Sequence, residues 1–262
     1  MKIILCLKQV PENNIKMDWD KGKLIRESSN NALNPDDYHA IEFALNLKEQ
    51  FGGNITAITM GPPQAEEVLR EAYSFGINKA ILITDPRFAG SDTLVTSKIL
   101  NRAIEKMGKF DIIVTGKRSA DGDTGHVSYQ LSEYFQIPHI TQIHTFKLEG
   151  DKNAIVERIF GHEFQKVRTP LPIVAAIEKK ANDVRFPKLV NIKKSFDKEI
   201  QIMNMDDIGG SEDEYGLLGS PTITLNGELF RHERKNEVFE GTMTQKADQL
   251  ISKLKKYNML GN

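Results

Sequence analysis

Residues 110–135 read FDIIVTGKRSADGDTGHVSYQLSEYF, and three patterns follow one another in this stretch. The run from Asp111 to Thr115 is short, apolar and β-branched, and it ends at Gly116, which is typical of a strand buried on both faces. Beyond Gly125 the apolar side chains recur at helical spacing, which predicts a helix. These side chains are Val127, Leu131 and Tyr134.

The turn between this strand and this helix, residues 117–125, has the composition of a phosphate-binding loop. Its glycines let the backbone approach a ligand closely, and the first N–H groups of a helix favour an anion. The same residues also allow a plain surface loop, in which Asp-Gly forms a turn and Asp-Thr caps the helix. The turn alone therefore does not establish a phosphate site.

Composition and charge exclude several classes of protein. A chain of 262 residues with 39% hydrophobic and 27% charged residues can bury a sizeable core. The net charge of -1 provides no basic surface for nucleic acid, and no run of eighteen apolar residues is present to span a membrane. The single cysteine, Cys6, excludes an internal disulfide and a multi-cysteine cluster. Any redox chemistry has to come from a bound organic cofactor.

The expected organisation is a nucleotide-binding α/β domain over residues 1–190 and an extended C-terminal arm over residues 191–262. The arm has few long apolar runs, so we expect it to be disordered or to wrap around a partner. Its last stretch, residues 242–257, has one apolar face and predicts a docking helix. The first residues form a strand rather than a targeting segment, and the expected location is the cytoplasm.

Strand patterns alternate with amphipathic helices over the first half of the chain. This alternation predicts right-handed βαβ units, and hence a three-layer fold with a mostly parallel sheet between helices. From Ile140 the pattern changes to an antiparallel hairpin with arms at 140–148 and 154–159, followed by strands at 164–168 and 172–176. A weaker alternation at 15–26 suggests a small hairpin. The strands of the parallel part are expected at residues 3–7, 54–60, 79–84 and 111–115.

The turns that follow the parallel strands should lie at one edge of the sheet, where such folds bind ligands. Lys8 is either an anion ligand there or a solvated strand end. Asn34 precedes Pro35 and is either the cap of a helix or a ligand of the nucleotide. The segment 89–93 should cap a further helix over residues 94–107. Five turns converging on one edge favour a binding site over an incidental loop.

Three strings in order give this chain a family resemblance. Asp121-Gly122-Asp123-Thr124 after Gly116-Lys117, with Asn34-Pro35 upstream and Met60-Gly61-Pro62 between them, resembles the beta subunit of electron-transfer flavoprotein. The resemblance covers essentially the whole chain. It implies an alpha-subunit partner that carries an electron-transferring FAD, and a second nucleotide held by this subunit.

The resemblance leaves two cofactors open for that second site. In ordinary members the nucleotide is AMP, a structural ligand, whereas in electron-bifurcating members it is a second FAD that exchanges a hydride with NAD(H). The strings at 58–65 and 88–93 look like the bifurcating members. A non-redox nucleotide-binding module of the same fold is a third possibility, against which the arm argues. The subunit would be enzymatic only as part of a complex with the alpha subunit and a dehydrogenase.

Residues that match the family's nucleotide site are expected to bind the cofactor, and no catalytic residue or metal ligand is expected. They are Cys6, Lys8, Asn34, Met60, Gly61, Ser91, Asp92, Thr93, Gly116, Arg118, Ser119, Asp121, Gly122, Asp123, Thr124, Gly125 and His126. Two of them depart from the family pattern, because Arg118 and His126 replace the usual glutamines. Asp92 and Thr93 are the expected donors near the flavin ring.

The expected partners are the alpha subunit, ferredoxin and a flavin dehydrogenase of the acyl-CoA or 2-hydroxyacid type. The family's docking loop follows an Asp-Leu-Gly-like string and presents a leucine anchor. Here Asp207-Ile208-Gly209 precedes an acidic stretch, residues 210–214, without a leucine. We therefore expect a permanent dehydrogenase complex, with contacts spread over the arm. The alternative is a shifted anchor at Tyr215, Leu217 or Leu218.

Overall fold

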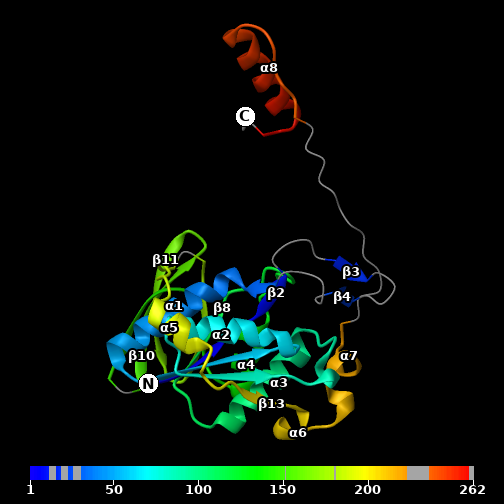
Figure 1. The fold of residues 1–262 in the computed structure, drawn as a ribbon. Coiled ribbons are helices and arrows are strands. Elements are labelled where there is room, and N and C mark those ends of the chain that lie inside the picture. The colour runs from blue at the N-terminus through cyan, green and yellow to red at the C-terminus, as the bar shows by residue number, and fades with distance from the viewer. Residues whose placement is uncertain are drawn as a thin grey trace. The chain divides into compact units, whose positions relative to one another are not determined.

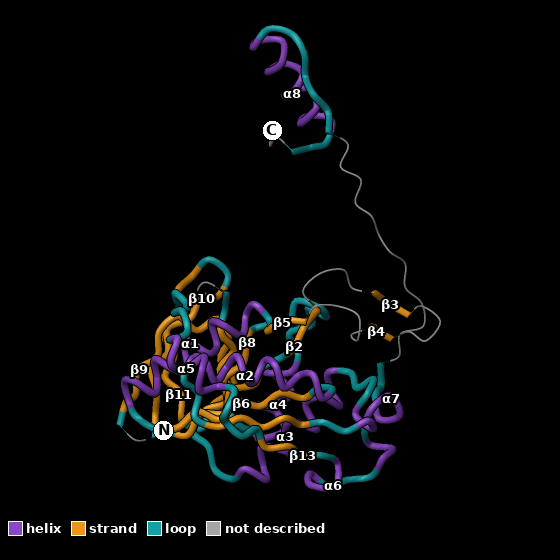
Figure 2. The backbone as a smooth tube through the Cα atoms, viewed as in Figure 1, coloured by secondary structure: helices purple, strands orange, loops and turns teal. Residues whose placement is uncertain are grey.

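A nine-stranded sheet is the centre of the described residues, which are 1–11, 16–18, 23–25, 31–150, 152–179, 181–222 and 236–259 of this computed structural model. Its strands can be followed in Figures 1 and 2. Across the sheet they are β11 (Glu163–Pro170), β10 (Asn153–Phe160), β9 (His139–Glu149), β12 (Ile173–Ile177), β8 (Ile112–Gly116), β1 (Lys2–Cys6), β6 (Asn54–Met60), β7 (Lys79–Ile83) and β13 (Gln201–Met203). Neighbours from β9 to β13 are parallel, and β9, β10 and β11 are antiparallel.

Helices cover both faces of this sheet, which confirms the predicted three-layer α/β fold. The alternation of a strand sends successive side chains to opposite faces. In β1, Ile3 and Leu5 pack with α1 (Pro35–Phe51) and α2 (Glu66–Phe75), whereas Ile4 and Cys6 pack with α3 (Thr93–Met107) and α4 (Val127–Phe135). Two apolar cores therefore sandwich the sheet. A short helix, α5 (Leu189–Ser195), packs on α2.

Most predicted elements of the α/β part form where the pattern placed them. Asp92 caps α3 by accepting from Val95 N at 3.0 Å, and Gly76 ends α2 with φ of 105°. The small hairpin is confirmed as β3 (Lys16–Asp18) and β4 (Lys23–Ile25), although Trp19 and Gly22 lie outside the described residues. A second short pair joins β2 (Gln9–Pro11) to β5 (Asn31–Leu33).

Helix α4 begins at Val127, as predicted for the chain beyond Gly125. His126 occupies the cap position and makes no side-chain cap hydrogen bond, so the Asp-Thr cap of the plain-loop alternative is not formed. Tyr134 is also exposed, because the buried side of this short helix is formed by Ser128 and Leu131. Without a capping side chain, the first N–H groups of α4 keep their capacity to bind another acceptor.

Residues 201–222 pack within the first of two compact units, Met1–Asn226. The segment contains β13, α6 (Met205–Ile208), a 3₁₀ turn η3 (Glu212–Glu214) and α7 (Gly216–Gly219). Strand β13 pairs with β7, and four side chains join the core on the α3 face. They are Met203, Met205, Ile208 and Tyr215. The sequence has no apolar run here. Each of these apolar residues is isolated in the sequence and packs by itself against the sheet edge or α3.

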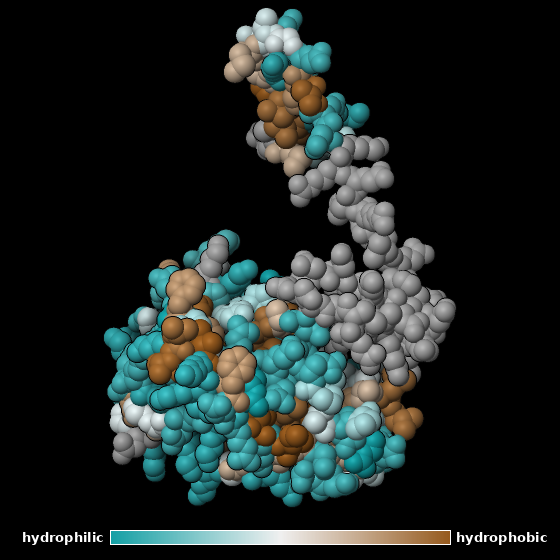
Figure 3. Space-filling model, in the orientation of Figure 1, coloured by the Kyte–Doolittle hydropathy of each residue, from teal (hydrophilic) through white to brown (hydrophobic). Residues whose placement is uncertain are grey.

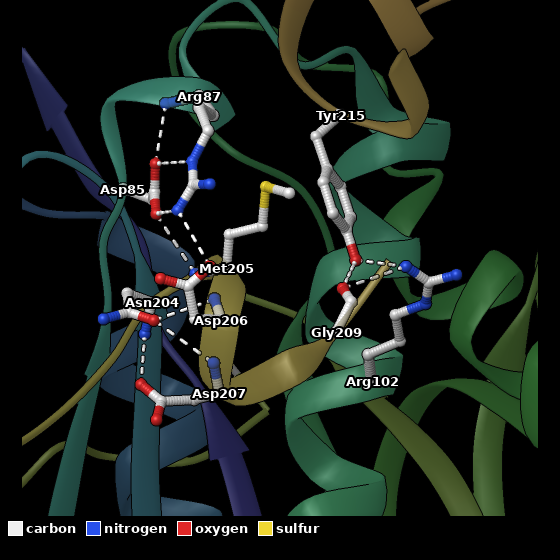
Figure 4. A network of polar contacts seen from close by, with 9 residues as sticks. All are labelled: Asp85, Arg87, Arg102, Asn204, Met205, Asp206, Asp207, Gly209 and Tyr215. Carbon is white, nitrogen blue, oxygen red and sulfur yellow. Dashed lines mark hydrogen bonds and ion pairs between the residues drawn. The ribbon is translucent and has the colours of Figure 1, made fainter. Parts of the chain in front are cut away.

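Two polar clamps hold this segment, as Figure 4 shows. Asp85 accepts hydrogen bonds from the guanidinium of Arg87 at 2.8 Å and from Met205 N at 3.1 Å. The bond from Arg87 is the main reason that the pKa of Asp85 lies well below its usual range. Asn204 caps α6 by accepting from the backbone of Asp206 and Asp207. The sheet end and the first turn of α6 are thus joined through one buried carboxylate.

The second clamp centres on Tyr215, whose side chain is 1% exposed and packs edge-on against Phe88. Its hydroxyl donates to Gly209 O and contacts Arg102 (Figure 4). Glu214 accepts from Lys98 at 2.6 Å, which with further bonds lowers the pKa of Glu214 to about 2. The acidic stretch after Gly209 is therefore partly neutralised within the chain itself.

The second unit, Gly227–Asn262, contains the helix α8 (Met243–Lys256). Thr242 and Gln245 form a capping box at its start, as expected for the predicted helix at 242–257. None of its side chains is buried, and Leu250 and Ile251 are exposed. Among the described helices of both units, none is long and apolar enough to cross a membrane.

Replacing Tyr215 by alanine should lower the free energy of unfolding by about 3–5 kcal/mol, because a buried aromatic ring and its hydrogen bonds are lost together. Thermal or urea unfolding measures this change. The matched control is Leu218→Ala, where the side chain is 78% exposed and the expected change is within about 0.5 kcal/mol. Equal effects of the two substitutions would show that the segment does not depend on this clamp.

Candidate functional site

The chain reverses its direction of travel across the sheet between β1 and β8. It runs from β1 outward to β6 and β7, and then returns to β8 on the other side of β1. In open α/β sheets the crevice at such a switch point, at the carboxyl ends of the strands, is where ligands bind. Lys8 follows β1 here, and the loop of residues 117–126 follows β8.

Lys8 reaches directly into that loop. Its Nζ donates to Asp121 Oδ1 at 2.7 Å and to Ser119 Oγ at 3.2 Å. The Lys8 side chain is 41% exposed, whereas the Asp121 side chain is only 5% exposed. Burial by itself would raise the pKa of Asp121, but the Lys8 charge and the hydrogen bonds from Lys8, Ser119 and Gly122 lower it overall. The predicted loop residues are thus organised around one cation at the strand end.

Asn34 occupies the cap position of α1, yet its side chain does not cap the helix. Its Oδ1 accepts from Ala120 N at 3.0 Å, and its Nδ2 donates to Arg118 O and to Asp37 Oδ1, both at 2.9 Å. The interpretation of Asn34 as only a cap is therefore wrong. The amide instead ties the first turn of α1 to the backbone of the loop.

Asp37 is a site residue that the sequence analysis missed. It is buried at the third position of α1, and Oδ2 accepts from Lys8 N at 2.7 Å while Oδ1 accepts from Asn34. Burial raises the pKa of Asp37 to about 7, although these two hydrogen bonds oppose the rise. The only sequence signal was an acidic residue in the first turn after Asn-Pro, which is common at helix starts.

Three glycines of the site face different constraints. A Cβ at Gly116 would overlap Asp37 Oδ1 and come within 3.0 Å of Asp36 Cβ, so α1 approaches β8 too closely for a side chain. Gly125 has φ of 64°, a conformation that L-residues rarely adopt. Gly122 has neither constraint, because its Cβ would lie 3.8 Å from Ser119 Oγ, its nearest neighbour. The protein itself leaves room at Gly122.

The outer part of the loop is exposed. Arg118 and Asp123 form an ion pair at 3.1 Å, with Asp123 in the left-handed region at φ of 49°. Thr124 and His126 are exposed at the turn into α4. These two polar side chains line the approach to the loop from solvent.

The remaining predicted site residues lie in other surroundings. Asp92 accepts from Thr222 N at 3.2 Å as well as capping α3, and Ser220 Oγ accepts from Asp92 N at 2.9 Å. Thr93 Oγ1 accepts from Gln130 of α4 at 3.4 Å, and Ser91 bonds to Phe88 O. These three residues form a second group, which is anchored to the segment 216–222.

Three further predicted residues lie at the carboxyl ends of β1 and β6. The Cys6 thiol is buried in the core, and burial followed by the charge of Asp37 raises its pKa far above the usual range. Met60 packs against the same core, and Gly61 N donates to Ile83 O at 3.1 Å. A thiol held in its neutral form is inert toward redox chemistry.

Comparison with known proteins decides the family. The model of the electron transfer flavoprotein domain matches residues 21–208. The chain belongs to the electron transfer flavoprotein family. It is 40% identical to the electron transfer flavoprotein subunit beta of Thermoanaerobacterium thermosaccharolyticum, over 97% of this chain and 98% of that relative.

Two further electron transfer flavoprotein relatives carry names that include a reductase. The chain is 36% identical to a caffeyl-CoA reductase-Etf complex subunit of Acetobacterium woodii, over 99% of this chain and 100% of the relative. It is 35% identical to the acryloyl-CoA reductase electron transfer subunit gamma of Anaerotignum propionicum, over 97% and 98% respectively. The chain is a beta-type subunit with a role in electron transfer. Its described residues contain no group of three or more side chains suited to a metal ion.

Gly116→Ala and Gly122→Ala should differ in their effect on the stability of the isolated chain. Gly116→Ala forces α1 away from β8 and should lower the free energy of unfolding by about 1–3 kcal/mol or more. Gly122→Ala should leave it within about 0.5 kcal/mol, because its Cβ meets only ordinary contacts. Chemical unfolding of the isolated chain checks both. A large loss of stability for Gly122→Ala would contradict the loop geometry described above.

Proposed function

We propose that this subunit holds a nucleotide at the crevice between β1 and β8, with its phosphates on the loop of residues 117–126. The observation that carries this proposal is the convergence of Lys8, Asn34 and the loop at the switch point, through the hydrogen bonds given above. A lysine ammonium, free helix-start N–H groups and a glycine with open space around it are what a phosphate requires. The seventeen predicted site residues are retained as the proposed binding set.

Unsatisfied groups at this edge support the fit of a nucleotide. Within the described residues, two buried hydroxyls have no hydrogen-bond partner: Ser128 Oγ in the first turn of α4, and Thr59 Oγ1 one residue before Met60. Buried polar groups are normally hydrogen-bonded, so a ligand or its water at this edge would satisfy them. Gly122, in the loop before α4, leaves open space around its own position.

The proposed nucleotide is FAD, with AMP as the alternative. The reductase names of two relatives and the string at 88–93 support the bifurcating type. When bound, such a flavin exchanges a hydride with NAD(H), and electrons then pass to the alpha-subunit FAD and toward ferredoxin and a dehydrogenase. Lys8 and the loop would hold the diphosphate, while Ser91, Asp92 and Thr93 would set the polarity beside the ring. The subunit acts as an enzyme only within that complex.

The complex of this subunit with its alpha partner should release two FAD and no AMP on denaturation, because one flavin is held by each subunit. Chromatography and the visible spectrum give the count. One FAD with one AMP would replace the proposal by the structural AMP site.

Gly122→Ala tests the place of that nucleotide. The added methyl group has room in the chain but would enter the space assigned to the phosphates, so the nucleotide of this subunit should be lost while the alpha-subunit FAD remains. The stability of the nucleotide-free variant is the internal control. Retention of the full nucleotide content would place the phosphates elsewhere.

The proposed partner of the C-terminal arm, residues 191–262, is the alpha subunit. Helix α8 supports this assignment, because an amphipathic helix without buried side chains needs an apolar surface to cover it. The segment up to residue 222 packs on its own domain, so the contacts with the alpha subunit would concentrate beyond it.

A separate surface around α5 is proposed to dock the dehydrogenase. Leu189 is 81% exposed, and Phe186, Val190 and Phe196 are exposed beside it in the sequence. Figure 3 shows apolar surface at the position of α5, bordered by hydrophilic residues. Lys188, Lys193 and Lys194 lie on the same helix or at its start. An exposed leucine on a helix that also carries lysines at both ends suits a partner with an apolar pocket and an acidic rim.

The alternative anchor lies on α7, so Leu189→Ala and Leu218→Ala form a matched pair of exposed leucines. Leu189→Ala should weaken dehydrogenase binding about tenfold or more, with unchanged stability, because anchors in pockets carry most of the affinity. Leu218→Ala should leave binding unchanged. Titration of the alpha–beta complex with its co-purifying dehydrogenase measures both. The reverse result would place the anchor on α7, and recovery of a bare dimer that serves several dehydrogenases would refute a permanent complex.

A further inference from the structure

The carboxylate of Asp37 touches each chain segment that meets at the switch point. Oδ2 accepts from the backbone of Lys8, directly after β1, at 2.7 Å. Oδ1 accepts from Asn34 at 2.9 Å, and Asn34 in turn binds the backbone of residues 118 and 120. Oδ1 also lies against Gly116 at the end of β8, which is why a side chain at 116 would overlap it. One buried side chain thus connects both strand ends and the loop.

Both groups that are hydrogen-bonded to the Asp37 carboxylate are donors. An ionised carboxylate offers acceptors on both oxygens, whereas a protonated one must present an O–H to one of them. The backbone N–H of Lys8 and the amide Nδ2 of Asn34 therefore match the ionised form. Loss of either contact would free the Lys8 backbone or the loop at residues 118–120.

We propose that Asp37 is a positioning residue for nucleotide binding, which holds Lys8 and the loop in their binding orientation only as a carboxylate. The proposal rests on the proposed nucleotide site and adds a dependence of that site on pH. Asp37 itself does not contact the phosphates, because it lies below the loop and is buried. Its effect passes through Lys8 and Asn34.

The charged and titratable groups around Asp37 set the pH range. Burial and, to a smaller extent, the charge of Asp36 on the same helix raise its pKa to about 7, against the hydrogen bonds from Asn34 and Lys8 and the Lys8 charge, which lower it. The Cys6 thiol near the end of β1 adds no charge, because burial and then the charge of Asp37 raise the pKa of that thiol far above neutral pH. Near neutral pH, Asp37 therefore changes between the form that positions the loop and the form that does not.

The same shift has a definite sign for stability. Between its ordinary value of 3.8 and about 7, the unfolded chain has lost this proton and the folded chain keeps it. Stability therefore falls as pH rises through that window and levels off above it. Above pH 7 the folded chain holds a carboxylate that burial disfavours.

The test compares Asp37→Asn with Asp111→Asn in the alpha–beta complex. Asp111 is the matched control, because its Oδ2 accepts from Lys2 N at 2.6 Å at the opposite end of β1. FAD is the probe, since its diphosphate does not titrate between about pH 6 and about pH 8.5. Affinity for FAD at the second site and thermal unfolding of the stripped complex are both measured across this range. His126→Gln is run in parallel, because imidazole is the other kind of side chain that titrates near neutral pH.

At about pH 8, Asp37→Asn should weaken FAD binding about tenfold or more without lowering the unfolding temperature, since it removes a buried charge while breaking one donor contact. The wild-type affinity should fall below pH 7, and Asp37→Asn should show a flat profile. Asp111→Asn should bind FAD normally. This wild-type profile needs no variant, so it tests the proposal even if Asp37→Asn folds poorly.

Two kinds of failure are distinguishable. If Gly122→Ala abolishes FAD binding but Asp37→Asn binds with the wild-type affinity and pH profile, the positioning role is wrong and the nucleotide site stands. A pH profile that flattens in His126→Gln rather than in Asp37→Asn likewise overturns it. If the wild-type complex binds neither FAD nor AMP at a second site, the proposed function itself fails.

Discussion

The close approach of α1 to the end of β8 is the constraint on which the site depends. Because no side chain fits at position 116, the first turn of α1 lies directly on the strand, and this contact places Asn34 and Asp37 beneath the loop. Lys8 is then held twice, through its backbone by Asp37 and through its ammonium by Ser119 and Asp121. The ammonium is thereby kept at the mouth of the crevice, as electrostatic preorganisation requires.

The residues of the site form two layers, an inner one that sets the shape of the loop and an outer one that is available for ligand contacts. The inner layer, Asn34 and Asp37, is buried, whereas the outer layer, Lys8 and the loop from Arg118 to His126, is partly or fully exposed apart from the Asp121 carboxylate. Arg118 and His126, where the resemblance leads us to expect glutamines, fall in the outer layer. Ligand contacts can therefore change there without disturbing the contacts that set the shape of the loop.

The features that could be predicted from the sequence are those that depend on patterns over a few neighbouring residues. The strand that ends at Gly116, the helix capped by Asp92 and the hairpin after Ile140 all formed as expected, because alternation, capping and turn chemistry act over a few residues. Asp37 and Tyr215 were not recognised, because an acidic residue in a first turn and an isolated tyrosine gain their roles from partners far away in sequence. Family resemblance could name the loop, but it could not reveal the amide of Asn34 beneath it.

Strand β13 has a consequence for how the chain is made. Strand β7 ends at Ile83, and the strand that covers it does not begin until Gln201. Throughout synthesis of the intervening residues, β7 presents unpaired backbone groups along a hydrophobic edge, which is the kind of edge that recruits other chains. The late segment thus protects this edge of the sheet, and a partly synthesised chain lacks that protection until residues 201–203 have been made.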